Sequence, residues 1–365
     1  MIYILIAAAV FIVLLYLIIT NRSVFGAEAK GKRLERMHQS RHYKDNQFQN
    51  LSYTPSLAEG YTFPKVLYDF FFKKKNPLLK PLNNIPSIHT DLKNIPKNQD
   101  VFVWLGHSSY YIQTDGVSFL IDPVLSLYGS PFKFFNKAFT GADIFKPEDI
   151  PVLDYLVITH DHYDHLDYPT IKAIKNRVNT VILPLGVGAH LERWGYRPDQ
   201  LIEEEWGDNA VLKSEIKITF TPARHFSGRK VKRNVTLWTS YVLETPTKKI
   251  FLGGDSGYDT HFKMIGDKYG PFDYAIIENG QYNQAWKYIH ALPEDVIQAS
   301  IDVNAKNIIP VHSSKFALAL HAWNEPLEKV TSLGKEKNLT ILTPMIGEPL
   351  DLNKTDHQFK AWWKE

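Results

Sequence analysis

The sequence predicts a layered α/β domain, and the spacing of its short apolar runs is the main reason. Between about residues 100 and 311, strand-like runs of three to six residues alternate with stretches that have helical periodicity. Such alternation favours mixed strands and helices in layers over an all-β domain. Hydrophobic residues make up 44% and charged residues 22% of the 365 positions, as is normal for a globular protein.

The expected strands are rich in β-branched and aromatic residues, and turn signals such as Asp115-Gly116 separate some of them. They are Val101–Leu105, Tyr110–Gln113, Ser118–Ile121, Leu156–Thr159, Val181–Leu183, Ile216–Thr221, Thr239–Leu243, Ile250–Leu252, Ala275–Ile277 and Ile308–Val311. The clearest helical stretches are Tyr168–Lys175, Gly186–Trp194 and Pro293–Val303.

The amino terminus predicts a membrane anchor at residues 1–21. Residues 2–20 contain no charge, and as a helix they span about 28 Å, close to the ~30 Å hydrocarbon core of a bilayer. No Lys or Arg precedes the run, which argues against a cleaved signal peptide. Basic residues cluster after it, so the positive-inside rule places the catalytic domain on the cytoplasmic side of a cell membrane that the chain crosses once. These residues are Arg22, Lys30, Lys32, Arg33, Arg36, Arg41 and Lys44.

Residues 22–95 are polar and Pro-rich, and we interpret them as an extension that precedes a main domain at 96–350 and a tail at 351–365. Within the extension, Tyr68–Lys75 combines aromatic residues with three lysines. This composition suits a membrane interface, but it also suits a short helix packed on the domain with its lysine end in solvent.

Composition also excludes some chemistry. The chain contains no cysteine, so disulfides, thiolate ligands and cysteine nucleophiles are ruled out. The net charge of +3 is too small to argue for nucleic acid by itself, and we expect no nucleic-acid partner.

The strongest chemical signal lies directly after a strand, in the segment Thr159–His165. It holds His160, Asp161, His162, Asp164 and His165. So many imidazoles and carboxylates on one loop are costly to bury unless a cation compensates them. Without thiolates, this donor set suits Zn²⁺ best, with Mn²⁺ or Fe²⁺ as alternatives.

Further ligand candidates stand where other apolar strands end. His225 follows Ile216–Thr221, Asp255 follows Ile250–Leu252, and His312 follows Ile308–Val311. Each would be an ordinary loop residue if taken alone. Together with the cluster, they are candidate metal ligands.

These residues, in this order, resemble the metallo-β-lactamase superfamily, whose motif His-x-His-x-Asp-His is followed by a distant His, Asp and His. The resemblance covers roughly residues 100–345 and implies a four-layer αβ/βα sandwich with two divalent metal ions at one edge. It implies that one ion is held by His160, His162 and His225, that the other is held by Asp164, His165 and His312, and that Asp255 bridges them.

Three segments are similar to a narrower branch, the N-acylphosphatidylethanolamine-hydrolysing phospholipase D enzymes. They are Trp104–Ser109, Gly253–Tyr258 and His290–Asp295. In that branch a further histidine precedes a Pro-Glu pair and lines the active site, and His290 matches it. The alternative is that His290 is a capping or surface histidine.

The resemblance implies a phosphodiesterase that acts on membrane phospholipids of this type. Asp164 and Asp255 would bind metal and orient the nucleophile, and His290 would form a hydrogen bond to the phosphoryl group or protonate the leaving alkoxide.

Other functions are compatible with the same residues. A hydrolase of a small soluble ester or lactone, such as a sugar-phosphate or signalling lactone, could use the same centre. A nuclease of the same fold would need a strongly basic surface. A non-enzymatic scaffold is disfavoured because all seven ligand positions are filled. Oligomeric state is left open.

For several other residues the sequence allows two interpretations, one functional and one structural. His107 either orients a ligand histidine or is a core histidine bonded to backbone. Asn279, Gly280 and Tyr282 are expected near the pocket, and Trp206, Phe226 and Trp286 either line an acyl-chain wall or belong to the core. The basic residues Arg229, Lys230, Lys232 and Arg233 either contact a lipid phosphate or form a solvated loop. We assign no chemistry to His38, His42, His89, His190, His261, His321 and His357.

Overall fold

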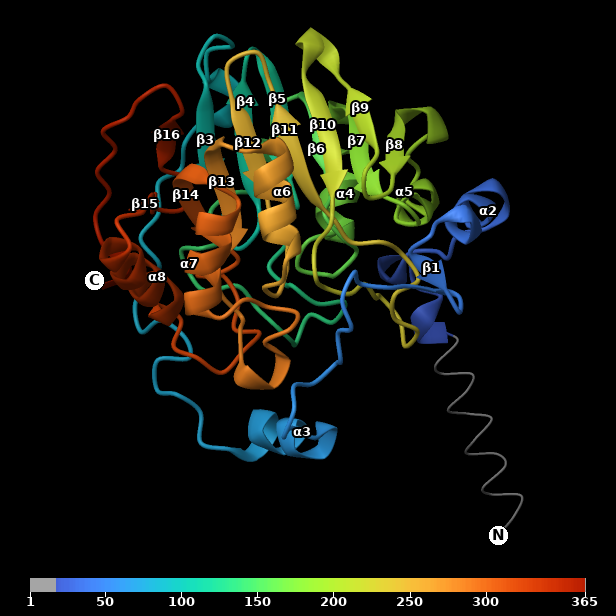
Figure 1. Ribbon diagram of the computed structural model, residues 1–365, viewed down its shortest axis with the longest axis horizontal. Coiled ribbons are helices and arrows are strands. Elements are labelled where there is room, and N and C mark those ends of the chain that lie inside the picture. The colour runs from blue at the N-terminus through green and yellow to red at the C-terminus, as the bar shows by residue number, and fades with distance from the viewer. Residues whose placement is uncertain (1–17, 365) are drawn as a thin grey trace.

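Two facing seven-stranded sheets form the centre of the computed structural model, which describes residues 18–364 (Figure 1). One sheet has the order β15 (Thr340–Ile341), β14 (Ala305–Val311), β13 (Phe272–Glu278), β12 (Lys249–Leu252), β11 (Ser240–Glu244), β10 (Lys217–Thr221) and β9 (Asn209–Val211). The other has the order β16 (Pro349–Asp351), β3 (Val101–Trp104), β4 (Tyr110–Thr114), β5 (Val117–Ile121), β6 (Leu153–Val157), β7 (Val178–Pro184) and β8 (Leu201–Glu204).

Helices cover the sheets and the edge of the sandwich. The α-helices are α2 (Gly31–Gln39), α3 (Phe63–Phe72), α4 (Tyr168–Ile174), α5 (Gly188–Arg193), α6 (His261–Tyr269), α7 (Pro293–Asp302) and α8 (Glu325–Glu336). Short 3₁₀ turns are η1 (Ser23–Phe25), η2 (Leu92–Asn94), η3 (Pro147–Asp149), η4 (Lys175–Arg177), η5 (Pro198–Gln200), η6 (Lys213–Glu215), η7 (Gln284–Trp286) and η8 (Trp362–Lys364). A small hairpin joins β1 (Tyr43–Lys44) to β2 (Gln47–Phe48).

Side-chain alternation along the strands builds the layers. On β12, Ile250 and Leu252 point into the core between the sheets, whereas Phe251 points to the helix side and packs with α6 and α7. On β13, Ile276 faces the first core and Ile277 the second. A period of two residues therefore places one face of each strand in each layer. The resulting sandwich confirms the expected layered α/β fold of the metallo-β-lactamase type.

Strand direction gathers the loops that follow the strands at one edge. Strands β5, β6 and β7 are parallel, as are β12, β13 and β14. The carboxyl ends of parallel strands meet at one edge of a sheet, which is where α/β proteins place ligands. This edge is the lower one in Figure 1.

Several expected strands differ from the observed strands at their ends, and one of these differences has a clear cause. The run Leu156–Thr159 was expected to be strand to its end, but β6 ends at Val157. The carboxylate of Asp122 accepts the backbone N–H of Thr159 at 2.8 Å, so this amide does not pair with a neighbouring strand. The short strands β8, β9, β15 and β16 and the helices α6 and α8 were not predicted from the sequence.

The segment after the expected anchor is bonded to the domain. Arg193 donates to the carbonyl of Gly26 at 3.0 Å, and Trp194 Nε1 donates to the carbonyl of Ser23 at 2.8 Å. Arg229 donates to the carbonyl of Val24 at 2.7 Å. The point where the amino-terminal segment enters the folded domain is therefore fixed.

The expected anchor itself falls mostly on residues 1–17, which lie outside the described residues. Among the helices that the structure describes, none is long and apolar enough to cross a bilayer.

The carboxyl-terminal tail packs on the domain. Trp362 and Trp363 are buried, and the ring centroids of Trp362 and Trp104 lie 6.1 Å apart.

Helix α3 stands apart from the sandwich (Figure 1). It has no buried residue, and Phe71 and Phe72 are 55% and 75% exposed. The second half of α3 thus covers Tyr68–Phe72 and the three lysines follow its end, but this helix is not packed into the core of the domain.

Candidate metal centre

Three histidines bring one nitrogen each to a common point at the edge of the sandwich. His162 Nδ1 lies 2.9 Å from His160 Nε2 and 3.2 Å from His225 Nε2. His160 and His162 follow β6, and His225 follows β10. Imidazole nitrogens that bind one tetrahedral Zn²⁺ at about 2.0–2.1 Å lie roughly 3.3 Å apart, so these spacings suit a single ion.

A second group lies beside the first. Ligand atoms of Asp164, His165, His312 and His107 all lie within 4.8 Å of one another. Asp255 stands between the groups. Its Oδ2 is 3.1 Å from His165 Nε2 and 3.8 Å from the Nε2 atoms of both His160 and His225, and its Oδ1 is 3.1 Å from His312 Nδ1. The structure therefore brings all seven candidate ligands together, in the two sets that the resemblance implied.

Buried polar atoms at this point need a partner. Among the described residues, His165 Nε2, Asp255 Oδ1 and His312 Nε2 are buried without a hydrogen bond. Burial lowers the pKa of His162 to about 4 and holds the pKa values of His160 and His225 well below their usual range, which favours neutral imidazoles with free lone pairs. Burial also raises the pKa of Asp255 to about 6. Neutral imidazoles around carboxylates fit divalent cations, which would satisfy the unpaired atoms.

Hydrogen bonds to residues around the cluster orient three of the imidazoles. His165 Nδ1 donates to Asp122 Oδ2 at 2.8 Å, and His225 Nδ1 donates to the carbonyl of Ile289 at 2.8 Å. Ser108 Oγ lies 2.7 Å from His312 Nδ1. Such bonds fix the tautomer and direction of metal-binding histidines.

His107 orients a carboxylate rather than a histidine. Its Nε2 lies 2.9 Å from Asp164 Oδ2, and the ring is fully buried. Although burial alone would raise the pKa of Asp164, the hydrogen bond from His107 and the neighbouring imidazoles hold that pKa well below its usual range. His107 was expected either to orient a ligand histidine or to bond to backbone. It does orient a candidate ligand, but that ligand is the carboxylate of Asp164 and not a histidine.

His290 is held at the rim of the cluster by a buried glutamate. Its Nδ1 lies 2.8 Å from Glu278 Oε2, while the backbone N–H of Ala291 donates to Glu278 Oε1 at 2.8 Å. The His290 ring stacks on His312, with centroids 5.2 Å apart. Burial raises the pKa of Glu278 and lowers that of His290. This pairing does not fit the alternative of a surface or capping histidine.

The backbone at Asp255 requires a glycine before it. Gly254 has a φ of +61°, and a Cβ there would lie 2.9 Å from the carbonyl oxygen of Thr239 and 3.1 Å from Cβ of Thr159. Only glycine adopts this conformation at such close approach without strain. The Gly-Gly pair therefore lets the β12 loop pass against the β6 loop and present Asp255 between the two groups.

The cluster forms the polar floor of a catalytic pocket of about 400 Å³. His162, Asp164, Asp255, His290 and His312 line the floor. Apolar side chains from α3, from the segment before it and from later parts of the chain line the walls, namely Leu57, Phe63, Val66, Leu67, Phe70, Phe226, Trp286, Ile289 and Leu318.

Two of the three aromatic residues expected to line an acyl-chain wall do line the pocket, Phe226 and Trp286. Trp206 does not. It packs in a separate core cluster, and its Nε1 donates to the carbonyl of Trp238 at 2.7 Å. Asn279, Gly280 and Tyr282 do not line the pocket either; Gln281 does.

The basic loop divides into two kinds of residue. Arg229 is 4% exposed and donates to the carbonyls of Asp161 and Leu166 at 2.7 and 2.8 Å, so it supports the metal-site loop and is neither solvated nor free to bind lipid. Arg233 stacks over Phe226 at 4.8 Å and lines the catalytic pocket. His190, to which we assigned no chemistry, lies 3.2 Å from Asp161 Oδ2 and accepts the N–H of Ala27.

Three residues around the centre were not predicted from the sequence: Asp122, Glu278 and Ser108. Asp122 directly follows β5, and Glu278 is the last residue of β13. Both are polar residues at the end of an apolar strand, the same signal that pointed to His225, Asp255 and His312. Ser108 has no comparable signal.

Comparison with known proteins agrees with this geometry. Residues 118–313 match the family model described as "Beta-lactamase superfamily domain". An uncharacterized protein of Mycobacterium tuberculosis is 33% identical over 349 residues, which cover 94% of this chain and 92% of that protein. The chain therefore belongs to the β-lactamase superfamily, and with the cluster described above it is a metal-dependent hydrolase of the metallo-β-lactamase fold.

The particular branch is indicated by a second relative. The N-acyl-phosphatidylethanolamine-hydrolyzing phospholipase D 1 of Caenorhabditis elegans is 32% identical over 244 residues, covering 63% of this chain and 68% of that enzyme. The protein resembles that branch. Among solved structures, a diiron β-hydroxylase from Streptomyces venezuelae has a TM-score of 0.55 at 18% identity, covering 70% of this chain and 55% of that one. This likeness extends to the fold alone.

Proposed function

We propose that this protein is a membrane-anchored phosphoric diester hydrolase of the phospholipase D type, acting on N-acylphosphatidylethanolamine-like phospholipids. The observation that carries the proposal is the division of the catalytic pocket. Its floor is the polar His/Asp cluster, and its walls are apolar side chains, four of them from α3. A pocket with a polar floor and apolar walls suits a substrate whose phosphodiester reaches the floor while its hydrocarbon contacts the walls. The relative from Caenorhabditis elegans supports the same substrate class.

Two divalent ions would be held by the seven residues of the cluster. His160, His162 and His225 would hold one, Asp164, His165 and His312 the other, and Asp255 both. The imidazole and carboxylate donor set favours Zn²⁺, and Fe²⁺ or Mn²⁺ would accept the same donors. When bound, such ions supply Lewis acidity toward water and toward the non-bridging oxygens of the phosphodiester.

The residues of the chain supply orientation and a proton. His107 holds the Asp164 carboxylate, and Asp122 holds the His165 ring, so neither ligand has to reorganise when substrate enters. Hydrolysis forms a bond from water oxygen to phosphorus and breaks the bond from phosphorus to the ethanolamine oxygen. The leaving alkoxide needs a proton.

We assign that proton to the pair formed by Glu278 and His290. With Nδ1 bonded to the carboxyl group of Glu278, the other ring nitrogen, Nε2, is left for the pocket that His290 lines. The pair carries one transferable proton whether it is written as imidazolium with carboxylate or as imidazole with carboxylic acid. His290 would thus be the general acid, and Glu278 a positioning residue.

Membrane anchoring is proposed from the sequence. The apolar run at residues 2–20 is long enough to span a bilayer, and the basic residues after it favour a cytoplasmic catalytic domain. The fixed attachment of Ser23–Gly26 to the domain supports this arrangement, since it would hold the domain at a set position beside the bilayer.

The test uses full-length protein loaded with zinc and N-acylphosphatidylethanolamine in mixed detergent micelles. Mass spectrometry should detect N-acylethanolamine and phosphatidic acid, and an Asp255→Asn variant should produce neither. If wild-type protein binds metal but forms neither product, the lipid substrate is wrong and the metallohydrolase class stands. Small phosphodiesters and lactones would then be assayed with the same control. Metal analysis of protein purified without added zinc would decide between zinc, iron and manganese.

A further inference from the structure

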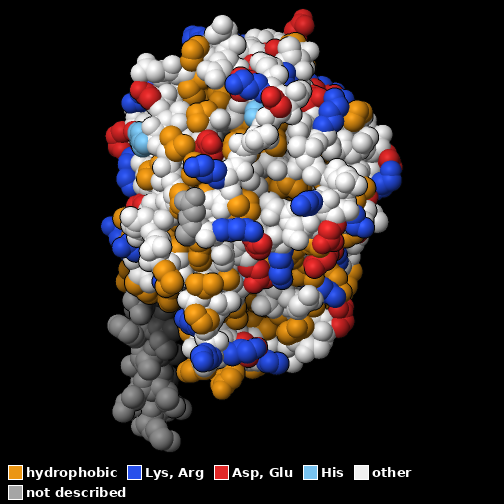
Figure 2. Space-filling view, turned by 90° about the vertical axis from the view of Figure 1, so that its left-hand side faces the viewer, with side chains coloured by type: hydrophobic (Ala, Val, Ile, Leu, Met, Phe, Trp, Pro, Cys, Tyr) orange, Lys and Arg blue, Asp and Glu red, His pale blue; other side chains and the backbone are white. Residues whose placement is uncertain are grey.

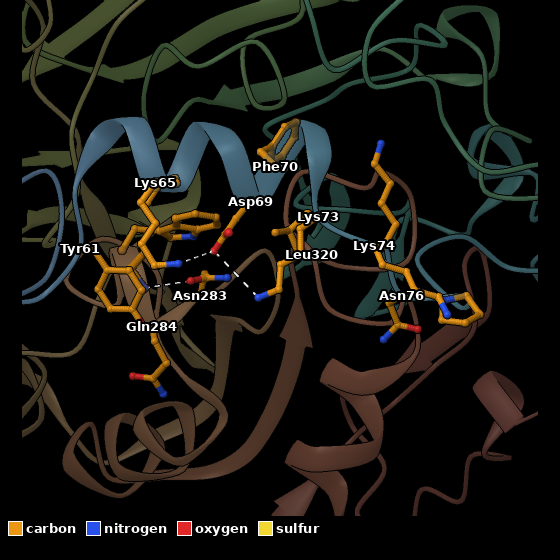
Figure 3. A pocket seen from close by; sticks show the side chains of 15 residues that line it. Tyr61, Lys65, Asp69, Phe70, Lys73, Lys74, Asn76, Asn283, Gln284 and Leu320 are labelled. Carbon is orange, nitrogen blue, oxygen red and sulfur yellow. Dashed lines mark hydrogen bonds and ion pairs between the residues drawn. The ribbon is translucent and has the colours of Figure 1, made fainter.

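Helix α3 separates the catalytic pocket from a second cavity that the proposed reaction does not use. This cavity has a volume of about 780 Å³ and lies between α3, the segment that follows it and residues 283–286 (Figure 3). Val66, Phe70 and Trp286 line both cavities, so they form the partition between them. On its other side, the second cavity is lined by Lys65, Lys73, Lys74 and Lys75.

The charge in this cavity is unbalanced. Lys65 and Lys73 both approach one carboxylate, that of Asp69, with Nζ to Oδ2 distances of 3.3 and 3.9 Å (Figure 3). Within residues 18–364, no ion pair involves Lys74 or Lys75. Four lysines against one aspartate leave an excess of three positive charges. An anion with a compact charge, such as a phosphate group, would compensate this excess.

The surface beside the cavity indicates where such a phosphate comes from. Tyr68, Phe71 and Phe72 on α3 are 61%, 55% and 75% exposed. Burying an aromatic ring away from water is favourable, so three exposed aromatic rings on one short helix favour a partner that covers them. Aromatic residues next to lysines are the composition of interfacial helices that bind anionic lipid. Figure 2 shows basic and hydrophobic side chains together at the lower end of the molecule, where α3 lies.

A second exposed aromatic segment lies in the loop of residues 132–135. Phe134 and Phe135 are 76% and 49% exposed, and Phe132 in the same loop contacts the ring of Phe25 at 6.2 Å. This loop also borders the metal centre, because a Cβ on Gly129 would lie 3.3 Å from Cβ of Asp164. Exposed aromatic residues therefore flank the centre on the α3 side and on the side of the amino-terminal turn η1.

We propose that the lysine-lined cavity behind α3 binds the phosphate headgroup of an anionic phospholipid, while Tyr68, Phe71 and Phe72 insert into the same bilayer. The bound headgroup holds α3 at the membrane surface, with the catalytic pocket open toward lipid. This site is separate from the metal centre and takes a lipid that is not hydrolysed. The proposal deepens the proposed function and rests on its membrane location, but its test needs no turnover.

The absence of cysteine allows a direct measurement of insertion. A nitroxide spin label is attached to a single introduced cysteine, Phe71→Cys, in the full-length protein reconstituted with phosphatidylcholine vesicles that contain or lack phosphatidylglycerol. Paramagnetic relaxation by oxygen and by a water-soluble nickel complex then reports the depth of the label. The matched control is Val211→Cys, which is 75% exposed on β9 at the opposite end of the sandwich (Figure 1). We expect the label at 71 to be inserted in vesicles with phosphatidylglycerol and the label at 211 to remain in water.

The lysines are tested by charge removal. The triple variant Lys73→Gln, Lys74→Gln, Lys75→Gln is compared, in the Phe71→Cys background, with Lys335→Gln, Lys337→Gln, Lys354→Gln, which removes the same charge from residues that do not line the cavity. At about fivefold per lysine near an anionic surface, removing three lysines should lower the ratio of inserted to uninserted label by up to about 100-fold. The control triple should leave the ratio within a few fold. Millimolar inorganic phosphate should not bring the label out of the bilayer if the ligand is a lipid headgroup.

Any other result of these label measurements overturns the proposal. A label at 71 that stays in water in both vesicle types shows that α3 does not bind lipid. Equal insertion with and without phosphatidylglycerol, or no loss in the lysine variant, shows that the cavity holds no headgroup. Release by phosphate identifies a soluble ligand. Inserted label in a protein that forms no N-acylethanolamine refutes the proposed function alone, and product formation without insertion refutes this inference alone.

Discussion

The metal-site loop and helix α3 face the same catalytic pocket, but different forces hold them. In the loop Thr159–His165, His160 and His165 are at most 1% exposed, and hydrogen bonds with Thr159 and with Asp122 fix their rings. In α3 no residue is buried, although most of its residues are apolar. The loop is thus determined by contacts within the chain, whereas α3 has an apolar surface that the described residues do not cover. The candidate metal ligands are therefore held in place before substrate binds, whereas access of substrate to the pocket depends on what covers α3.

The largest effect should come from the rim of the preorganised region. Replacing His290→Gln should lower kcat by about 10²-fold to 10⁴-fold on N-acylphosphatidylethanolamine, because the variant has no proton to give the leaving alkoxide. Glu278→Gln should cost less and should shift the pH profile of kcat. Steady-state kinetics and metal analysis check this. If either variant lost one metal ion, the residue would be a ligand, since Asp255, Glu278, His290 and His312 also converge within 4.8 Å.

Matched phenylalanine truncations test the difference in packing directly. Phe119→Ala, in the core between the sheets, should lower the free energy of unfolding by about 3–5 kcal/mol. Phe71→Ala on α3 should change it by no more than roughly 0.5 kcal/mol, because the side chain is 55% exposed. Denaturant unfolding monitored by circular dichroism measures both. A large cost at Phe71 would mean that α3 is held by the domain, and the comparison would fail.

The buried polar region should also give a characteristic pH dependence. Burial lowers the pKa of Lys315 to about 8, and its Nζ donates to the carbonyls of Leu105 and Val124 at 3.1 and 2.8 Å. Below pH 8, Lys315 is protonated in both the folded and unfolded states, and the cost of burying its charge is fully present. From pH 8 to about 10.5 the folded state loses this proton first, so the free energy of unfolding should rise with pH by about 2–3 kcal/mol in total.

The rise should be clearest between pH 8 and 9.5. At higher pH, ionisation of tyrosines in the unfolded state opposes it, since burial raises the pKa of residues such as Tyr111 to about 12 in the folded state. Urea titrations of wild type and Lys315→Met across this range provide the measurement. A wild-type stability that is flat or falls with pH, or a rise that persists in the variant, would assign the effect elsewhere.

The smallest effect concerns the bonds that orient the ligands. Asp122→Asn should weaken metal affinity by about 10-fold to 100-fold, because Asp122 holds both the His165 ring and the backbone of Thr159. Competition with a chelator of known affinity measures this. Asp154→Asn, at the other end of β6, is the control and should leave the affinity unchanged. Equal losses in the two variants would point to general destabilisation of the β6 strand.

Much of the fold and of the candidate site could be predicted from the sequence because both rest on local patterns. Ile250–Leu252 and Ala275–Ile277 are short apolar runs, a pattern typical of buried strands. His225, Asp255 and His312 follow the ends of such runs. The same rule would have found Asp122 and Glu278. Trp206 and Arg229 could not be placed, because whether an aromatic ring or a guanidinium faces a pocket, the core or solvent depends on chain segments distant in sequence.

The sequence by itself determined the class of the centre, since seven imidazole and carboxylate side chains in that order, without cysteine, leave few options but a divalent metal site. Only the tertiary structure decided which side chains support it and what surrounds it. The contact of His107 with Asp164, the pairing of Glu278 with His290, and the position of α3 between two cavities each join segments of the chain that no local pattern links. Ligand identity is local chemistry, whereas orientation and access follow from how distant segments pack.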